Sequence, residues 1–142
     1  MGFAIDPSTE FGAKATRRVV KENLAWLTTV DSRGTPQPNP VWFLWDNGSF
    51  IIFSKPNQAK LANIARTGRV SLNFEATPDE EQVTIFTGHA EIVERSTISR
   101  EILDRYAEKY AQGMIDINLP RKQYEAAYTE VIRVTPEKLR GW

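Results

Sequence analysis

The chain has 142 residues, of which 41% are hydrophobic and 25% are charged, with 18 basic and 18 acidic side chains. These values indicate one globular domain over residues 1–142, long enough to bury its own core. The zero net charge argues against a dedicated nucleic-acid-binding protein, and the absence of cysteine excludes disulfides, thiolate nucleophiles and cysteine-based metal sites. No apolar run is long enough for a transmembrane helix, and residues 1–10 lack the features of a secretory signal. We therefore expect a cytoplasmic protein that binds neither nucleic acid nor membrane.

The first part of the chain predicts a helix followed by short strands in hairpins. Asp6–Glu10 has the residues of a helix start, and apolar residues then recur at every fourth position. These apolar residues are Phe11, Ala15 and Val19. Strands are expected at residues 24–30, 37–45 and 50–53. Between them lie a turn in which Gly34 can take positive φ and the pair Asn47-Gly48, which fits a type I′ hairpin turn.

A short helix is expected directly after the third strand. Asn57 can cap its start, and the helix is expected to run to about Thr67, where Gly68 is suited to end it. The residues expected to face inward are Leu61, Ile64 and Ala65. The next segment, Arg69–Ala76, alternates strictly between apolar and polar residues, which predicts a strand with one buried face.

The second half predicts a long strand, two helices and a closing strand. The strand spans residues 82–94, and Gly88 indicates a bend or bulge in it. Ser96 or Thr97 can cap the following helix, whose apolar face is expected to contain Ile98, Ile102, Tyr106 and Tyr110. Pro120 can open a further short helix with Tyr124 and Tyr128 on one side, and the last strand is expected at 130–134. About six strands, early hairpins and no βαβ alternation favour an antiparallel barrel or split barrel.

The segment Ser54–Lys60 is the strongest chemical feature, because it leads from a strand into a helix start. A helix N-terminus offers free N–H groups and a positive dipole end to a phosphate. Lys60 lies in the first turn, where a cation is unfavourable unless an anion is bound beside it. Lys55 and the Ser54 hydroxyl can add donors. The segment therefore suggests a phosphate site, and the alternative is a pair of solvated lysines on a surface loop.

The second strand contains the run Gln37–Phe43, in which prolines alternate with polar residues before an apolar stretch. Prolines remove backbone donors and confine a strand to an edge or a bulge. An edge leaves backbone groups free, so it could pair with the pyrimidine side of a flavin-type ring while apolar side chains cover the ring. The alternative is an ordinary buried strand whose edge is protected by proline.

Other candidate sites are weaker. His89 is the only histidine, so it cannot form a histidine-rich metal site; it could be a haem ligand or a proton carrier, although a half-buried strand residue is the simpler interpretation. No Ser-His-Asp arrangement, Walker loop or GxGxxG motif occurs. Trp142, at the end of the chain, could pack against a partner chain or over a ligand.

With these motifs in order, the chain resembles the pyridoxamine 5′-phosphate oxidase-like FMN-binding split-barrel superfamily. More narrowly, it resembles the small flavin/deazaflavin oxidoreductases described as probable F420-dependent enzymes. The residues that carry the resemblance are Leu27–Asp31 with Gly34 and Pro36, Pro40–Phe43, Asn47-Gly48, Ser54-Lys55, Lys60, Asn63-Ile64, Arg69–Leu72, Gly88–Val93, Arg133–Pro136 and Gly141-Trp142.

The resemblance implies a mostly β fold, a six-stranded antiparallel split β-barrel with peripheral helices, and a homodimer with cofactor sites at the subunit interface. It implies an oxidoreductase that uses deazaflavin coenzyme F420 to transfer a hydride to a small unsaturated or quinone-like acceptor. The alternatives are an FMN-dependent oxidoreductase and a non-catalytic protein that binds flavin, deazaflavin or haem. The cofactor-binding residues that the resemblance suggests are Asn39, Pro40, Val41, Trp42, Ser54, Lys55, Lys60 and Asn63. Arg66 and Arg69 are candidates for contact with the acidic tail of F420.

Overall fold

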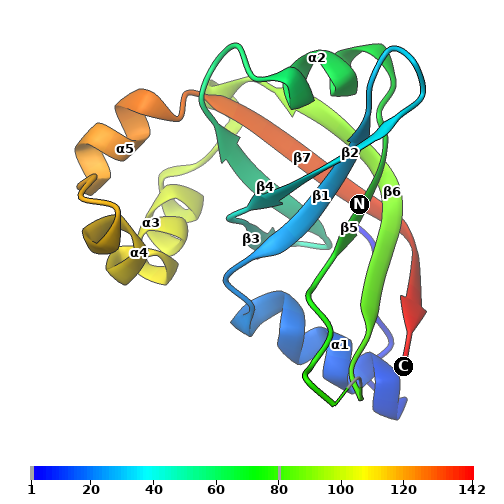
Figure 1. The fold of residues 1–142 in the computed structure, drawn as a ribbon. Coiled ribbons are helices and arrows are strands. Elements are labelled where there is room, and N and C mark those ends of the chain that lie inside the picture. The colour runs from blue at the N-terminus through cyan, green and yellow to red at the C-terminus, as the bar shows by residue number, and fades with distance from the viewer. Residues whose placement is uncertain (1, 80) are drawn as a thin grey trace.

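The computed structural model describes residues 2–79 and 81–142, and its centre is one antiparallel sheet of seven strands (Figure 1). The strands are β1 Ala25–Val30, β2 Pro36–Val41, β3 Leu44–Asp46, β4 Ser49–Ser54, β5 Arg69–Asn73, β6 Thr84–Val93 and β7 Glu130–Gly141. The helices are α1 Glu10–Lys21, α2 Ala59–Arg66, α3 Arg100–Lys109, α4 Ala111–Asp116 and α5 Arg121–Ala127, with a 3₁₀ turn at Arg95–Thr97. The protein is thus mostly β with short helices, as the sequence predicts.

The sheet is curled rather than flat. Its strand order is β2-β1-β5-β6-β7-β4-β3, so the two edge strands, β2 and β3, are neighbours in the chain and only Trp42 and Phe43 separate them. A sheet whose edges meet in this way is a half-closed barrel, in agreement with the predicted split barrel. In Figure 1, α2 lies at one end of the curled sheet, α1 at the other, and α3–α5 lie to one side.

The structure has seven strands where six were predicted, because the expected strand at 37–45 is two strands. The break falls at Phe43, whose backbone groups bond to α3 and Tyr110 instead of to a neighbouring strand. The Tyr110 hydroxyl accepts from the Phe43 N–H at 2.9 Å, and Lys109 Nζ donates to the Phe43 carbonyl at 2.9 Å. These partners lie more than 60 residues away in the sequence, so the local pattern contains no sign of them.

The last strand is longer than predicted: β7 continues from Glu130 to Gly141 instead of ending at Val134. Pro136 suggested an end, because proline cannot donate to a ladder. In the structure Pro136 pairs with Gly88 at a register shift in β6, which confirms the predicted irregularity there. A Cβ on Gly88 would lie 2.3 Å from the Thr135 carbonyl oxygen, so this bulge needs glycine.

The start and end of α2 differ from the prediction. Asn57 does not cap it: Asn57 has φ +63°, and Gln58 occupies the cap position with no side-chain bond to the helix. The helix ends at Arg66, and Gly68 does not take the left-handed conformation of a C-cap. Ala65 is exposed and Asn63 is buried in its place.

The N-cap residues of α1 and α3 can be compared with the residues that the sequence predicted to cap these helices. Thr9 caps α1 through its hydroxyl, within the segment expected to start that helix. Ser99 caps α3, whereas Ser96 and Thr97 lie in the preceding 3₁₀ turn, so that prediction was wrong by one turn. The hairpin turn is confirmed, since Asn47 and Gly48 both have positive φ.

The core has two parts, one on each side of β4 and β7. Inside the curled sheet, Phe43, Phe50, Phe74 and Phe86 pack with aliphatic residues. On the outer side, Tyr106, Tyr110 and Tyr124 of the helical segment pack on Phe53 and Val131. The helices α3–α5 are therefore bound to the sheet by an aromatic layer.

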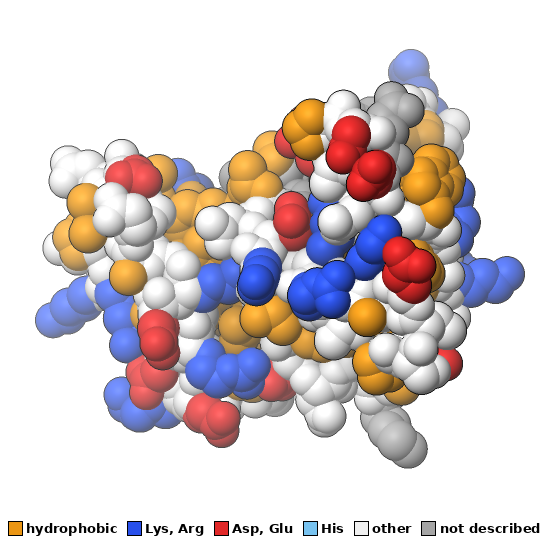
Figure 2. Space-filling view, turned by 90° about the horizontal axis from the view of Figure 1, so that it is seen from below, with side chains coloured by type: hydrophobic (Ala, Val, Ile, Leu, Met, Phe, Trp, Pro, Cys, Tyr) orange, Lys and Arg blue, Asp and Glu red, His pale blue; other side chains and the backbone are white. Residues whose placement is uncertain are grey.

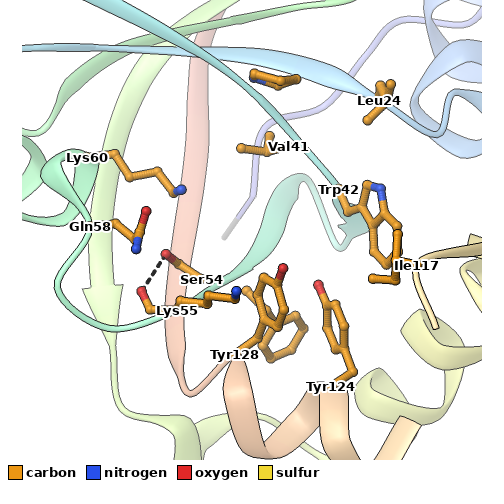
Figure 3. A pocket seen from close by; sticks show the side chains of 12 residues that line it. Leu24, Val41, Trp42, Ser54, Lys55, Gln58, Lys60, Ile117, Tyr124 and Tyr128 are labelled. Carbon is orange, nitrogen blue, oxygen red and sulfur yellow. Dashed lines mark hydrogen bonds between the residues drawn. The ribbon is translucent and has the colours of Figure 1, made fainter. Parts of the chain in front are cut away.

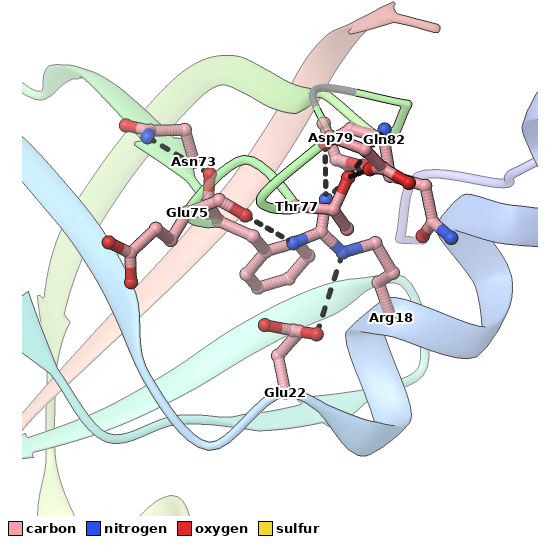
Figure 4. A network of polar contacts seen from close by, with 9 residues as sticks. Arg18, Glu22, Asn73, Glu75, Thr77, Asp79 and Gln82 are labelled. Carbon is pink, nitrogen blue, oxygen red and sulfur yellow. Dashed lines mark hydrogen bonds and ion pairs between the residues drawn. The ribbon is translucent and has the colours of Figure 1, made fainter.

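Helix α1 closes the end of the sheet opposite α2. Its Arg18 is only 6% exposed and reaches under the sheet to the β5–β6 loop (Figure 4). Figure 2 views the molecule from this side and shows basic side chains gathered near the middle of the face with acidic ones among them. Two further basic residues of α1, Arg17 and Lys21, are exposed.

Candidate functional site

A cavity of about 520 Å³ lies between the end of β2, the β4–α2 connection and the helical segment (Figure 3). Its lining residues are Leu24, Pro40, Val41, Trp42, Phe53, Ser54, Lys55, Gln58, Lys60, Ile117, Tyr124 and Tyr128. We call it the lysine–tyrosine pocket. Six of the eight predicted cofactor residues line it, although they come from two separate stretches of the chain.

One side of the pocket is basic. Ser54 ends the buried strand β4, and its hydroxyl donates to the Lys55 carbonyl at 2.8 Å. Lys55 is exposed, and its Nζ lies 5.6 Å from the centroid of the Tyr128 ring. Lys60 extends from the first turn of α2 into the cavity, and its ammonium points toward the centre in Figure 3.

The charge of Lys60 is not balanced by any acidic residue that the structure describes. Among residues 2–79 and 81–142, no carboxylate forms an ion pair with it. It is partly buried, and this burial lowers the pKa of its ammonium group. It also lies at the positive end of the α2 dipole, where no acidic residue occupies the first turn. A partly desolvated cation in this position would be stabilised by an anionic group in the pocket.

The opposite side of the pocket is aromatic. The Trp42 indole stacks on Tyr110 at 4.5 Å with an interplanar angle of 4°, and on Tyr124 at 5.5 Å with an angle of 15°. Tyr124 in turn stacks on Tyr128 at 4.1 Å. Pro40 and Val41 of the edge strand complete this apolar side. A flat ring could therefore lie against this wall while the lysines hold a charged group attached to it.

Trp42 is held rigidly because the backbone N–H and carbonyl of the next residue, Phe43, are both hydrogen-bonded. The Tyr110 hydroxyl also contacts the carbonyl oxygens of Asn23 at 2.8 Å and Phe43 at 3.0 Å, which joins three segments at one atom. Burial raises the pKa of the Tyr110 phenol, so it stays protonated and can donate. Gly113 of α4 touches the edge of the indole, since a Cβ there would lie 2.9 Å from it.

Two of the predicted residues lie outside the pocket. Asn39 is exposed on the edge strand, opposite Leu27 in β1. Asn63 is buried, and its amide donates to the Thr29 hydroxyl at 3.0 Å while its carbonyl oxygen accepts from Arg66. Asn63 therefore fixes α2, with Lys60 one turn earlier, to the end of β1.

The basic residues suggested for an acidic cofactor tail have partners within the chain. Arg66 donates to the Val30 carbonyl at 2.6 Å, and Arg69 forms an ion pair with Glu137 at 2.9 Å. Neither lines the lysine–tyrosine pocket.

His89 and Trp142 also lie away from it. His89 is exposed on β6, where its ring packs against Gly68, and Trp142 is 64% exposed beside Val83. Within the described part of the chain, no cluster of three or more metal-ligating side chains occurs. In that same part, none of the helices combines the length and apolarity needed to cross a bilayer.

Sequence reasoning missed half of the lining residues, above all Tyr124 and Tyr128. Their four-residue spacing predicted that they lie on one side of a helix. In the structure Tyr124 lies in α5 and Tyr128 directly follows its end, and their rings stack on each other. Nothing in that spacing shows that α5 returns beside Lys55, since this depends on how the segment between β6 and β7 folds back. Leu24, Phe53, Gln58 and Ile117 lack a polar pattern that would have marked them.

Comparison with known proteins adds a family and a set of related folds. Residues 12–142 match the family model described as pyridoxamine 5′-phosphate oxidase. Among solved structures, an F420 reductase is 24% identical with a TM-score of 0.69, covering 87% of this chain and 94% of its own. A conserved hypothetical protein from Mycobacterium tuberculosis is 23% identical with a TM-score of 0.69, covering 100% and 89%. HutZ, the haem storage protein from Vibrio cholerae, is 18% identical with a TM-score of 0.67, covering 94% and 95%. A search of curated protein sequences finds no match.

Proposed function

This chain belongs to the pyridoxamine 5′-phosphate oxidase family, and we propose that it is an oxidoreductase that uses deazaflavin coenzyme F420. The reduced cofactor would pass a hydride to a small unsaturated or quinone-like acceptor. The observation that carries the proposal is the placement of two lysines opposite an aromatic wall across one cavity. The fold similarity to an F420 reductase supports the choice of cofactor.

The residues present fit such a cofactor. Lys60 and Lys55, with the Ser54 hydroxyl, would hold its phosphate, because the ammonium groups have no carboxylate partner among the described residues. Trp42 and Val41 would lie along the ring and keep water from one face. When bound, the deazaflavin supplies the hydride chemistry. The side chains of this pocket bind, orient and exclude water, which is consistent with a site that has no acid–base pair.

FMN is the alternative cofactor. It has a flat ring and one phosphate, so the same lysines and the same aromatic wall could serve it. Arg66 and Arg69, which were candidates to bind the acidic tail of F420, both bond to other residues of the chain. An acidic cofactor tail would then extend past them into solvent or toward another subunit.

A non-catalytic haem-binding role has less support from the geometry. His89 is the only histidine of the chain, and it does not line the lysine–tyrosine pocket. The similarity to a haem storage protein keeps haem as a ligand to be tested.

We further propose a cytoplasmic homodimer whose second subunit completes each pocket. The exposed Leu24 lines the cavity, and the exposed Trp26 pairs with Pro40 in the open edge strand β2, so this side is available to a second copy. Light scattering at micromolar concentration should give about twice the chain mass of 16.2 kDa. A mass of one chain would contradict the shared site.

The direct test is a fluorescence titration of the ligand-free protein with F420 and, separately, with FMN. Tight binding of F420 with weak binding of FMN would support the proposal and justify a screen of acceptors under turnover. Tight binding of FMN alone would move the protein to the flavin branch of the family. Binding of neither, with a Soret band on addition of haem, would contradict an oxidoreductase of this kind.

A further inference from the structure

The lysine–tyrosine pocket contains a tyrosine hydroxyl that is hydrogen-bonded to a second, buried tyrosine. Tyr124 of α5 lines the pocket, and in Figure 3 its hydroxyl points toward the cavity. This oxygen lies 2.7 Å from the hydroxyl oxygen of Tyr106 in α3, and from the geometry alone either could be the donor. Which one donates decides what Tyr124 can offer to a ligand.

Both tyrosines are buried, Tyr124 being 4% exposed, and the difference that decides it is that only Tyr124 of the two lines the pocket. Tyr106 is 3% exposed and does not line the lysine–tyrosine pocket, and among the described residues its hydroxyl has Tyr124 as its hydrogen-bonding partner. If Tyr124 donated, the Tyr106 O–H would be a buried donor without an acceptor, which native proteins avoid. If Tyr106 donates, its hydrogen is satisfied and the Tyr124 hydrogen is free to turn into the cavity.

The surroundings keep this arrangement in place. Tyr124 is clamped between Trp42 and Tyr128, with ring distances of 5.5 and 4.1 Å, so its phenol cannot swing away from the pocket. Burial raises the pKa of both the Tyr106 and Tyr124 phenols, so both remain protonated at neutral pH. A hydroxyl that already accepts one hydrogen bond is also a stronger donor, because bonds in a chain polarise one another.

We propose that Tyr106 donates to Tyr124 and thereby directs the Tyr124 O–H to a carbonyl oxygen or ring nitrogen of the ligand bound in the lysine–tyrosine pocket. The inference rests on the proposed function and deepens it, since it assigns a polar contact on the otherwise apolar side of the pocket. Tyr106 is then a positioning residue, and Tyr124 a binding residue. The accepting atom could belong to the cofactor ring or to the hydride acceptor, and the experiment distinguishes the two.

The first test needs no ligand and compares three variants by thermal unfolding: Tyr124→Phe, Tyr106→Phe and the double variant. Tyr124→Phe leaves the buried Tyr106 hydroxyl without an acceptor, so its melting temperature should fall by about 4 °C or more. The double variant removes both partners and should recover part of that loss. A double variant no more stable than Tyr124→Phe would overturn the assigned direction.

The second test measures binding and turnover, with Tyr128→Phe as the matched control. Tyr128 also lines the pocket, and its hydroxyl forms no hydrogen bond with the described residues. Tyr124→Phe should weaken F420 or FMN binding by about two- to tenfold if the cofactor accepts the bond. If the hydride acceptor receives this hydrogen bond instead, the cofactor affinity should stay unchanged, while the KM for menadione should rise by a similar factor. An effect no larger than that of Tyr128→Phe in both measurements would overturn the proposal. A wild-type protein that binds neither cofactor would instead contradict the proposed function itself.

Discussion

Each of the two ends of the curled sheet contains a basic side chain that is at least partly buried. The two side chains differ in whether other residues of the chain bond to them. At the α1 end, Arg18 donates to the carbonyls of Glu75 and Gln82 and to the Thr84 hydroxyl, and it pairs with Glu22 (Figure 4). At the α2 end, Lys60 enters a cavity with no such partners among the described residues. A buried cation whose side-chain nitrogens all have partners is part of the architecture. A partly buried cation without such partners indicates a place for a ligand.

The largest effect on stability is expected from a substitution of Arg18, the basic residue that has several partners. Arg18→Met should lower the free energy of unfolding by about 3 kcal/mol, because three buried or partly buried acceptors and the Glu22 carboxylate lose their partner. Urea unfolding measures this, and Arg17→Met, at an exposed position of the same helix, should change stability by less than about 0.5 kcal/mol. If the two variants were equally stable, the contrast between the two ends would fail.

Lys60→Met should show the opposite profile. Charge-assisted hydrogen bonds contribute about 1.5–3 kcal/mol, so affinity for the phosphorylated cofactor should fall by roughly ten- to a hundredfold. Stability should stay equal or rise, since the variant removes a partly desolvated charge that has no partner among the described residues. Lys21→Met, on the exposed surface of α1, is the charge-matched control and should bind cofactor normally. Unchanged affinity in the Lys60 variant would remove this residue from the site.

Lys55→Met should have a smaller effect on the same measurement. Lys55 is exposed, so water screens its charge, and we expect a loss of less than about fivefold in cofactor affinity. The ratio of FMN affinity to riboflavin affinity is the more specific measurement, because the two ligands differ only in the phosphate group. A ratio that falls more in this variant than in Lys60→Met would reverse the proposed order of the two lysines.

Lys109 is the intermediate case, with one carbonyl partner and its ammonium 3.7 Å from the Phe43 ring centroid. Burial lowers its pKa to about 8, below the value near 10.4 expected in the unfolded chain. Between these values the unfolded state binds more protons, so stability should rise with pH. Relative to Lys109→Met, the free energy of unfolding should rise by at most about 2 kcal/mol from pH 7.5 to 9.5. A parallel pH dependence in both proteins would show that this lysine does not contribute.

Local patterns predicted the parts of the fold that local forces create. The Asn47-Gly48 turn follows from backbone preferences, and the strand containing Val70 and Leu72 follows from its alternation. The class of the fold and the basic side of the pocket could also be predicted, because Ser54–Lys60 is continuous in the chain.

What could not be predicted depends on contacts between distant segments. The break after Val41 requires the hydroxyl of Tyr110, and the burial of Asn63 requires Thr29 as its partner. The extension of β7 through Pro136 requires the bulge at Gly88 in the strand beside it. Each of these features depends on a partner more than 30 residues away in the sequence. A local sequence pattern does not include that partner, so it could not predict the feature.

The segment that builds the tyrosine side of the pocket leaves the sheet at Val93 and returns at Val131, and these two residues pair directly across β6 and β7. Everything between them, including α3–α5, is thus one continuous insertion whose ends are already adjacent. Evolution can lengthen, shorten or replace such an insertion without changing the register of any strand, provided that a group in it still bonds to the backbone of Phe43. The lysine side belongs to the scaffold and would be retained. Under the proposed function, the scaffold would therefore preserve the cofactor site, while exchange of the insertion would diversify the hydride acceptor.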